Sequence, residues 1–269
     1  MSLITLLTDF GTTDYFVGEM KGAILTVNPR ATVVDITHEI PAHDVEAGAF
    51  TLLAAHAAFP AGTIHVAVVD PGDGSERRAL VAECSGQLFV APDNGLLSYV
   101  CERDSAARFF RATNRKFFRE TVSHTFQGRD ILAPVAAALS LGTPPRETGE
   151  EIDDPVRLPR LAPRVGGDGT LEASIIHIDR FGNCVTNITP RDLGGEQAAC
   201  RVTLRLDGHT IYSFRRFFAD AAPESSDTVS PFMIWGSAGF LEIVAFQASA
   251  AELLGARRGQ TVTVVNRES

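Results

Sequence analysis

The sequence predicts two domains: an α/β N-terminal domain, with a parallel-rich sheet in Rossmann-like layers, and a mostly-β C-terminal barrel or sandwich. Three observations predict this fold class. The first half of the 269 residues alternates β-like runs with helical patterns, the second half holds short β-like runs, and a stretch rich in Pro and Gly separates them. We therefore expect an α/β domain at 1–152, a linker at 153–169 and a β-rich domain at 170–269.

The elements of the first half follow a β-α-β-α-β order. Their expected ranges are a strand at 4–9, a helix at 14–28, a strand at 32–37, a helix from Asp44 to Pro60 and a strand at 63–70. Asp44 is a good N-cap, and the β-branched run at 63–70 is typical of a buried parallel strand. ALVAEC and LFVAPDNG add two strands. Asp130 is expected to cap a helix through ILAPVAAALSL, with Pro134 in its first turn.

Proline and glycine mark the linker, and turn residues separate the predicted strands of the second half. Pro155, Pro159 and Pro163 precede a glycine-rich stretch that ends at Gly169. Short runs bounded by turn residues then predict strands; they are SIIHID, VTNIT, RVTLRL, TIYSF, FLEIVAF and TVTVVN. An Ala-rich stretch at 248–256 is the helix we expect in this half.

Charge and hydropathy exclude two classes of partner. Lys plus Arg number 24 against 33 Asp plus Glu, a formal net charge of -9, and no basic cluster is long enough to follow a phosphate backbone. We expect no nucleic-acid partner. No apolar run reaches the roughly 20 residues of a membrane span. The start MSLITLLTDF lacks a basic region and reads as a first core strand, so we expect a cytoplasmic protein with no membrane partner.

Cysteine and histidine spacing gives no metal site. Cys84, Cys101, Cys184 and Cys200 lie far apart without a C-x-x-C pair, so we expect buried free thiols. In HEIPAH the histidines are five residues apart and a proline interrupts the helix that a zinc motif needs. We therefore expect no metal and no cofactor.

Acidic residues follow four of the predicted strands. They are Asp9, Asp35, Asp70 and Asp93. Ligands of open α/β sheets bind beyond the carboxyl ends of the strands, so four acids at that edge favour a site there. Aspartate is also a common cap and turn former, which is the alternative for each one alone.

The segment VVDPGDGSERR is the most informative of these strand ends. Pro71, Gly72 and Gly74 predict a tight loop that brings Arg77 back within reach of Asp70. A carboxylate that faces a guanidinium can hold and polarise a water molecule. The alternative is a structural ion pair that braces the loop.

Three further motifs contain candidate ligand-binding groups. TFQGRD places the neutral amide of Gln127 before a predicted helix. IDRFGNCVTNI offers Asp179, Phe181 and Asn183 around a glycine turn, which suits a purine or an amino-acid head group; a β-turn with one core phenylalanine is the alternative. In WGSAGFLEI, Ser237 and nearby N–H groups can receive a carboxylate, or the segment is an ordinary turn before a strand.

Taken together, these motifs resemble a known family. The blocks, in order, are TLLTDFGTTDYFVGEMKG, VVDITHEIPAHDV, FPAGTIHVAVVDPGDGSERR, APDNGLLS, TFQGRDILAPVAAAL, IDRFGNCVTNI and GSAGFLEI. They resemble the S-adenosylmethionine hydroxide adenosyltransferases, the hydrolase relatives of the fluorinase and chlorinase. The resemblance implies a homotrimer with sites at subunit interfaces. It also implies attack of water or hydroxide on the ribose C5′ of S-adenosylmethionine, which releases adenosine and L-methionine without a metal.

The resemblance also implies roles for individual residues. Asp9 would bind the ribose hydroxyls, and Asp179 and Ser237 would hold the methionine amino and carboxylate groups. Phe181, Asn183 and Phe218 would form the adenine and substrate pocket, with Phe126 and Gly128 shaping the wall of the water site. The water-handling Asp and Arg of the hydrolases match Asp70 and Arg77, whereas their histidine, in T-F-H-G-R-D, falls on Gln127.

Three functions follow from this pattern. The first is hydrolysis in which Asp70 is the base, because a glutamine cannot take up a proton near pH 7. The second is halide attack that gives a 5′-halo-5′-deoxyadenosine, with an anion pocket near Phe126 and Gly128; the charge of Asp70 opposes it. The third is a non-catalytic protein that binds adenosine or S-adenosylmethionine.

Overall fold

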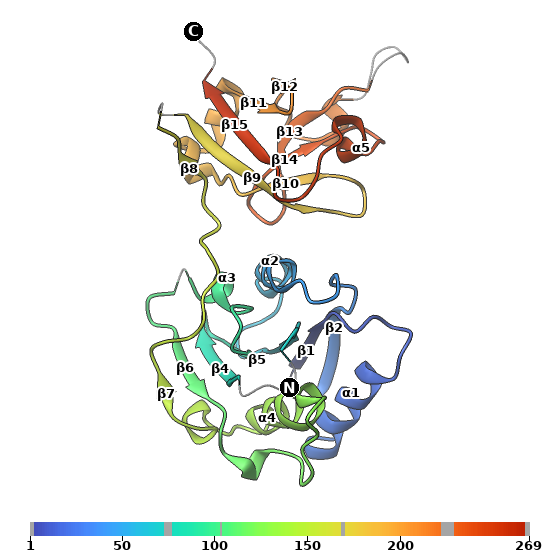
Figure 1. Ribbon diagram of the computed structural model, residues 1–269, viewed down its shortest axis with the longest axis vertical. Coiled ribbons are helices and arrows are strands. Elements are labelled where there is room, and N and C mark those ends of the chain that lie inside the picture. Colours follow the sequence, from blue (N-terminus) through green and yellow to red (C-terminus); the bar gives the residue numbers. More distant parts are fainter. Residues whose placement is uncertain (1–2, 73–76, 103, 168–169, 222–228, 267–269) are drawn as a thin grey trace. The chain divides into compact units, whose positions relative to one another are not determined.

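The protein consists of two compact units, which we describe separately. The computed structural model (Figure 1) describes residues 3–72, 77–102, 104–167, 170–221 and 229–266. Unit 1 comprises Met1–Pro159 and unit 2 comprises Arg160–Ser269, so the boundary falls inside the Pro/Gly-rich stretch. Gly74 of the predicted loop and Gly169 of the predicted linker lie outside the described residues.

Unit 1 contains a seven-stranded sheet and four α-helices. Its strands are β1 (Leu3–Thr8), β2 (Thr32–Thr37), β3 (Ile64–Val68), β4 (Ala79–Cys84), β5 (Gln87–Pro92), β6 (Arg108–Arg111) and β7 (Glu151–Ile152). Its α-helices are α1 (Phe16–Val27), α2 (Val45–His56), α3 (Ser98–Cys101) and α4 (Ala133–Ser140), and its other helical turns are η1 (Arg115–Phe117), η2 (Gly128–Leu132) and η3 (Pro145–Glu147).

The sheet of unit 1 has a parallel half and an antiparallel half. In the strand order β2-β1-β3-β5-β4-β6-β7, the first four strands are parallel and the remaining pairings are antiparallel. Figure 1 shows α1 and α4 on one face of this sheet and α2 and α3 on the other. The predicted α/β domain is confirmed, although its sheet is mixed where a parallel-rich one was expected. All five residues of β3 are buried, as its β-branched run predicted.

The sequence predicted two helix N-caps, and the structure confirms one of them. Asp44 caps α2, with its carboxylate accepting a hydrogen bond of 3.0 Å from the Ala47 N–H. The prediction that Asp130 caps the next helix is wrong. Asp130 lies inside the π-helical turn η2, α4 begins at Ala133 with Pro134 in its first turn, and the Asp130 carboxylate instead binds Arg129 at 2.7 Å. A guanidinium in the preceding position competes better for this buried carboxylate than helix N–H groups do.

Unit 2 is built on one barrel-like antiparallel sheet, which confirms a mostly-β domain. Its strands are β8 (Arg164–Val165), β9 (Leu171–Ile178), β10 (Cys184–Thr186), β11 (Val202–Leu206), β12 (His209–Ile211), β13 (Phe232–Trp235), β14 (Leu241–Val244) and β15 (Thr261–Asn266). Its helical segments are η4 (Pro190–Leu193), η5 (Glu196–Arg201), η6 (Phe218–Ala221) and α5 (Ala250–Leu254). The helix expected at 248–256 is α5, and β13 is a strand that the sequence pattern did not predict.

The cysteines differ from the expectation in two respects. Cys84 and Cys101 are far apart in sequence, yet their buried Sγ atoms lie 2.8 Å apart. Cys200 is exposed, so the prediction of a buried thiol is wrong at that position.

Within the described ranges, no helix is long and apolar enough to cross a membrane.

Candidate functional site

Three of the four acids predicted at strand ends lie at one edge of the unit 1 sheet. Asp9, Asp70 and Asp93 follow the carboxyl ends of the parallel strands β1, β3 and β5, whereas Asp35 lies inside β2, opposite Leu6 of β1. Three of these acids have partners of their own. The Asp9 carboxylate accepts a hydrogen bond of 2.8 Å from the His43 N–H, whereas Asp35 pairs with Lys21 at 2.7 Å and Asp93 with Arg78 at 2.6 Å.

Asp70, Arg77 and Gln127 form one connected group. The Arg77 guanidinium makes an ion pair with the Asp70 carboxylate, and its second amino group donates a hydrogen bond of 3.2 Å to the Gln127 Oε1 atom. The Asp70 side chain is 4% exposed and that of Arg77 is 12% exposed. Burial lowers the pKa of Arg77 from its ordinary value. The structure thus brings together the three residues that the sequence assigned to water handling.

The predicted wall residues Phe126 and Gly128 belong to the core of unit 1. The Phe126 ring packs edge-on against Phe10 and Phe16, with ring centroids 5.7 and 5.4 Å away. Gly128 is buried, and a Cβ placed on it would meet the Phe126 ring at 3.4 Å. Gly128 is therefore packed beside the Phe126 ring in the core of unit 1.

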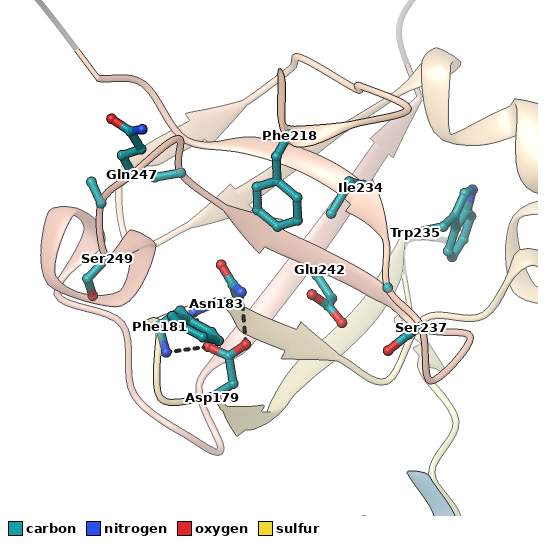
Figure 2. Close-up of a pocket in the computed structure, with 13 residues that line it drawn as sticks. Asp179, Phe181, Asn183, Phe218, Ile234, Trp235, Ser237, Glu242, Gln247 and Ser249 are labelled. Carbon is teal, nitrogen blue, oxygen red and sulfur yellow. Dashed lines mark hydrogen bonds between the residues drawn. The ribbon is translucent and has the colours of Figure 1, made fainter. Parts of the chain in front are cut away.

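In unit 2, a cavity of about 790 Å³ contains all five of the predicted binding residues of that unit. They are Asp179, Phe181, Asn183, Phe218 and Ser237. Figure 2 shows that they come from separate segments: the turn between β9 and β10, η6, and the loop after β13. Phe181 is 75% exposed, so the alternative of a core phenylalanine in an ordinary turn is wrong.

Asp179 holds the turn that presents Phe181. Its Oδ1 atom accepts hydrogen bonds of 2.9 Å from the Phe181 and Asn183 N–H groups, and its Oδ2 atom accepts one of 2.8 Å from the Asn183 side chain. Gly182 lies between them at φ +81°, where an added Cβ would also overlap Ser249. The turn therefore needs a glycine, and it fixes an aromatic face beside an amide and a carboxylate.

The cavity also contains an acid that sequence reasoning missed. Glu242 of β14 lines it, and burial, with a smaller contribution from the charge of Asp179, raises the pKa of Glu242 to about 7. A signal was present in the sequence, because Glu242 is a lone charge in the apolar run FLEIV. Alternation along a strand places such a residue opposite its buried neighbours.

Comparisons with known proteins assign the chain to a family. Residues 4–149 match the model of the SAM hydroxide adenosyltransferase N-terminal domain, and residues 173–263 match that of the C-terminal domain. The chain belongs to the SAM hydroxide adenosyltransferase family. An (R)-S-adenosyl-L-methionine hydrolase of Methanocaldococcus jannaschii is 36% identical, with 94% of this chain and 92% of the relative covered.

Other relatives place the chain within this family of adenosyltransferases. The (R)-S-adenosyl-L-methionine hydrolase of Thermus thermophilus is 34% identical over 98% of this chain and 100% of the relative. A fluorinase of Actinoplanes sp. is more distant, with 28% identity over 97% of both chains. The crystal structure of an uncharacterized conserved protein from Thermotoga maritima aligns with a TM-score of 0.87 and 33% identity, over 98% of this chain and 100% of that one.

Proposed function

We propose that this protein hydrolyses (R)-S-adenosyl-L-methionine to adenosine and L-methionine, by attack of water on the ribose C5′. The observation that carries the proposal is the buried ion pair of Asp70 and Arg77, in a family member more similar to hydrolases than to a fluorinase. The sulfonium leaves as a neutral thioether, so the protein needs to orient water in line with the bond that breaks and to remove its solvent shell.

Asp70 is the proposed base, and Arg77 the group that positions it. Water gives a proton to the Asp70 carboxylate while its oxygen forms the new bond to C5′ and the C5′–S bond breaks. Gln127 is a positioning residue, because its amide oxygen accepts a hydrogen bond from Arg77 and glutamine does not titrate. The fixed guanidinium keeps Asp70 ionised and oriented.

The unit 2 cavity is the proposed binding site for the adenine and methionine parts. Phe181 and Phe218 provide exposed aromatic faces, and the Asn183 amide can recognise a purine edge. Asp179 and Ser237 would hold the amino and carboxylate groups of the methionine part, and Asp9 in unit 1 would hold the ribose hydroxyls.

Two properties of the proposal come from the resemblance to the family: a homotrimer with active sites at subunit interfaces, and a reaction that needs neither metal nor cofactor. A cytoplasmic location is a further proposal, made from the sequence. Sedimentation or light scattering of the purified protein tests the first, since a trimer has three times the 28.9 kDa chain mass. Unchanged turnover after dialysis against a chelator tests the second property.

The direct test is a product assay on the two sulfonium epimers, with and without chloride. We expect adenosine and L-methionine in equal amounts from the (R)-epimer, at a rate independent of chloride. A chlorinated nucleoside that forms only with chloride would show a halide adenosyltransferase. Binding of S-adenosylmethionine without any product would show a non-catalytic binding protein, and either result contradicts the proposal.

A further inference from the structure

Glu242 occupies a special position in the unit 2 sheet. It lies on β14, directly opposite Val185 of β10 and Ile234 of β13. Its neighbours Leu241 and Ile243 are completely buried in the hydrophobic core, so the alternation of the strand turns Glu242 to the cavity side. Figure 2 shows its carboxyl group projecting into the space bounded by Asp179, Phe218 and Ser237.

The Glu242 carboxyl group lies directly against the backbone of Gly236. A Cβ on residue 236 would overlap the Glu242 carboxyl group, so only glycine allows the carboxyl to lie against this backbone. Within the described part of the chain, no hydrogen bond to the Glu242 carboxyl is formed. The Glu242 carboxyl oxygens can therefore accept hydrogen bonds from a ligand that enters the cavity.

Asp179 differs from Glu242 in this respect. Three hydrogen bonds from its own turn already reach the Asp179 carboxylate, out of about four that a carboxylate accepts. Among the described residues that line the cavity, Asp179 and Glu242 are acidic and none is Lys, Arg or His. An ammonium group has three N–H donors, more than Asp179 alone can accept. The cavity thus suits a ligand whose positive charge reaches both acids.

We propose that Glu242 is the second acceptor for the α-ammonium group at the amino-acid end of the ligand, and that it gives its proton to solvent as that group binds. This inference rests on the proposed function, since it assumes that the cavity receives the methionine part of S-adenosylmethionine. It adds to that function a residue that positions the substrate and a coupling between substrate binding and pH.

The electrostatics of the empty cavity support this proton release. Burial and the charge of Asp179 raise the pKa of Glu242 to about 7, and a bound ammonium lowers it again by supplying the opposite charge. From β13, Ile234 faces Glu242 and is uncharged. His177 lies in the same row of the sheet, beyond Val185, and burial lowers its pKa below the ordinary value. His177 is therefore neutral near pH 7.

The test is calorimetry with S-adenosyl-L-homocysteine, which keeps the ammonium group but lacks the sulfonium leaving group. Titrations in two buffers of different ionisation enthalpy measure the protons released. We expect release near pH 7 and an affinity that rises about tenfold from pH 6 to pH 8. Glu242→Gln should abolish proton release near pH 7 and, at pH 8, weaken binding about 10- to 100-fold, because it removes a hydrogen bond to a charged group.

Two controls make the result specific. Glu252→Gln makes the same change on the exposed first turn of α5 and should leave binding unchanged. Gly236→Ala keeps both acids but displaces the Glu242 carboxyl, so it should also reduce proton release. Adenosine, which has no ammonium group, should bind wild type and Glu242→Gln equally.

Three outcomes overturn the inference. They are equal affinity of wild type and Glu242→Gln at pH 8, uptake of a proton on binding, and no binding of S-adenosyl-L-homocysteine. Proton uptake would show that Glu242 stays protonated and donates to the ligand carboxylate. The proposed function has a separate test, because the calorimetric ligand is not hydrolysed. If wild type turns over S-adenosylmethionine but Glu242→Gln binds S-adenosyl-L-homocysteine as tightly as wild type does, this inference alone is rejected. If wild type releases a proton on binding S-adenosyl-L-homocysteine but does not turn over S-adenosylmethionine, hydrolysis alone is rejected.

Discussion

The residues Asp70, Arg77 and Gln127 of unit 1 contact one another, whereas Phe181, Phe218 and Glu242 of unit 2 face a cavity. In unit 1, Arg77 is held between Asp70 and Gln127, so the group is assembled before any ligand arrives. In unit 2, Phe181 and Phe218 are exposed and Glu242 projects into a cavity of about 790 Å³. A rigid, buried group suits the orientation of a small nucleophile, and an open cavity lined by aromatic rings suits the binding of a large ligand.

Asp70→Asn should have the largest effect on this division of roles. Asparagine keeps the shape but cannot accept a proton, so we expect turnover to fall about 10²- to 10⁴-fold. Binding of S-adenosyl-L-homocysteine should stay within a few-fold of wild type. Asp35→Asn, in β2 of the same sheet, is the matched control and should leave turnover unchanged. A large loss of binding in Asp70→Asn with a normal rate at saturation would reverse the roles that we give to the two units.

The pH dependence of stability should separate the two units. Burial, with a smaller contribution from the charge of His56, lowers the pKa of His65 in unit 1 to about 4. Below its ordinary pKa of 6.5, the unfolded chain binds the proton first, so unit 1 should lose about 3 kcal/mol of unfolding free energy between pH 6.5 and 4. In unit 2, burial also lowers the pKa of His177, which acts as His65 does. The raised pKa of Glu242 acts in the opposite direction and offsets it, because folded unit 2 takes up this proton before the unfolded chain does.

Trp235, the one tryptophan of the sequence, lies in unit 2 and makes this difference measurable. Denaturant unfolding followed by its fluorescence should change little or become more resistant to denaturant from pH 7 to 4.5. Unfolding followed by helical circular dichroism, which reports mainly α1, α2 and α4 of unit 1, should shift to lower denaturant concentration. Thr5→Val removes the hydroxyl that contacts His65 Nδ1 at 2.7 Å and serves as a local probe of that histidine. Parallel shifts of both signals would contradict the prediction.

Gln127→His tests whether a residue at position 127 of unit 1 can take part in proton transfer. A histidine can accept the hydrogen bond from Arg77 and also take up a proton, so we expect turnover to rise about 10²-fold where acid–base assistance operates. The pH profile should acquire a limb near the histidine pKa of about 6.5. Gln127→Met, of similar length, loses the acceptor and should lower the rate. If Gln127→His left the rate unchanged or lowered it, Gln127 would belong to a different arrangement of the nucleophile.

Ser237→Ala should have the smallest effect of the series. It removes one hydroxyl from the cavity, and a single hydrogen bond to a charged group contributes about 1.5–3 kcal/mol, so we expect S-adenosyl-L-homocysteine to bind about tenfold or more weakly. The rate at saturating substrate should not change, because the role proposed for this hydroxyl is to bind the methionine part of the substrate. Ser249→Ala, also in the cavity lining, is the control, with binding measured by calorimetry. Equal losses in both variants would show that Ser237 has no specific role.

The sequence could predict the fold and the pairing of Asp70 with Arg77 because local signals agreed with the final packing, whereas Gln127 was assigned by the resemblance alone. The β-branched run before Asp70, the Asp44 cap and the polar strand ends all have local causes, and the parallel strands bring three of the four acids to one edge. Asp130 was mispredicted as a cap because Arg129 binds its carboxylate, and pattern alone cannot rank the two partners.

The unit 2 cavity depended on information that sequence periodicity does not contain. Glu242 lies on β14 and Asp179 in the turn between β9 and β10, and their interaction arises only when these strands pair. The contact between Cys84 and Cys101 likewise requires α3 to pack against β4. Strand β13 was missed because its segment, FMIW, is short and uniformly apolar, without the alternation that marks a half-buried strand.

The central claim is that water attacks C5′ of the sulfonium substrate, and isotope incorporation tests it most directly. Turnover of (R)-S-adenosyl-L-methionine in water enriched in ¹⁸O, followed by mass spectrometry, shows which product receives the solvent oxygen. If water attacks C5′, we expect one ¹⁸O atom in the 5′-hydroxyl of adenosine and none in L-methionine. Unlabelled adenosine, or label in the amino-acid product, would contradict attack at C5′.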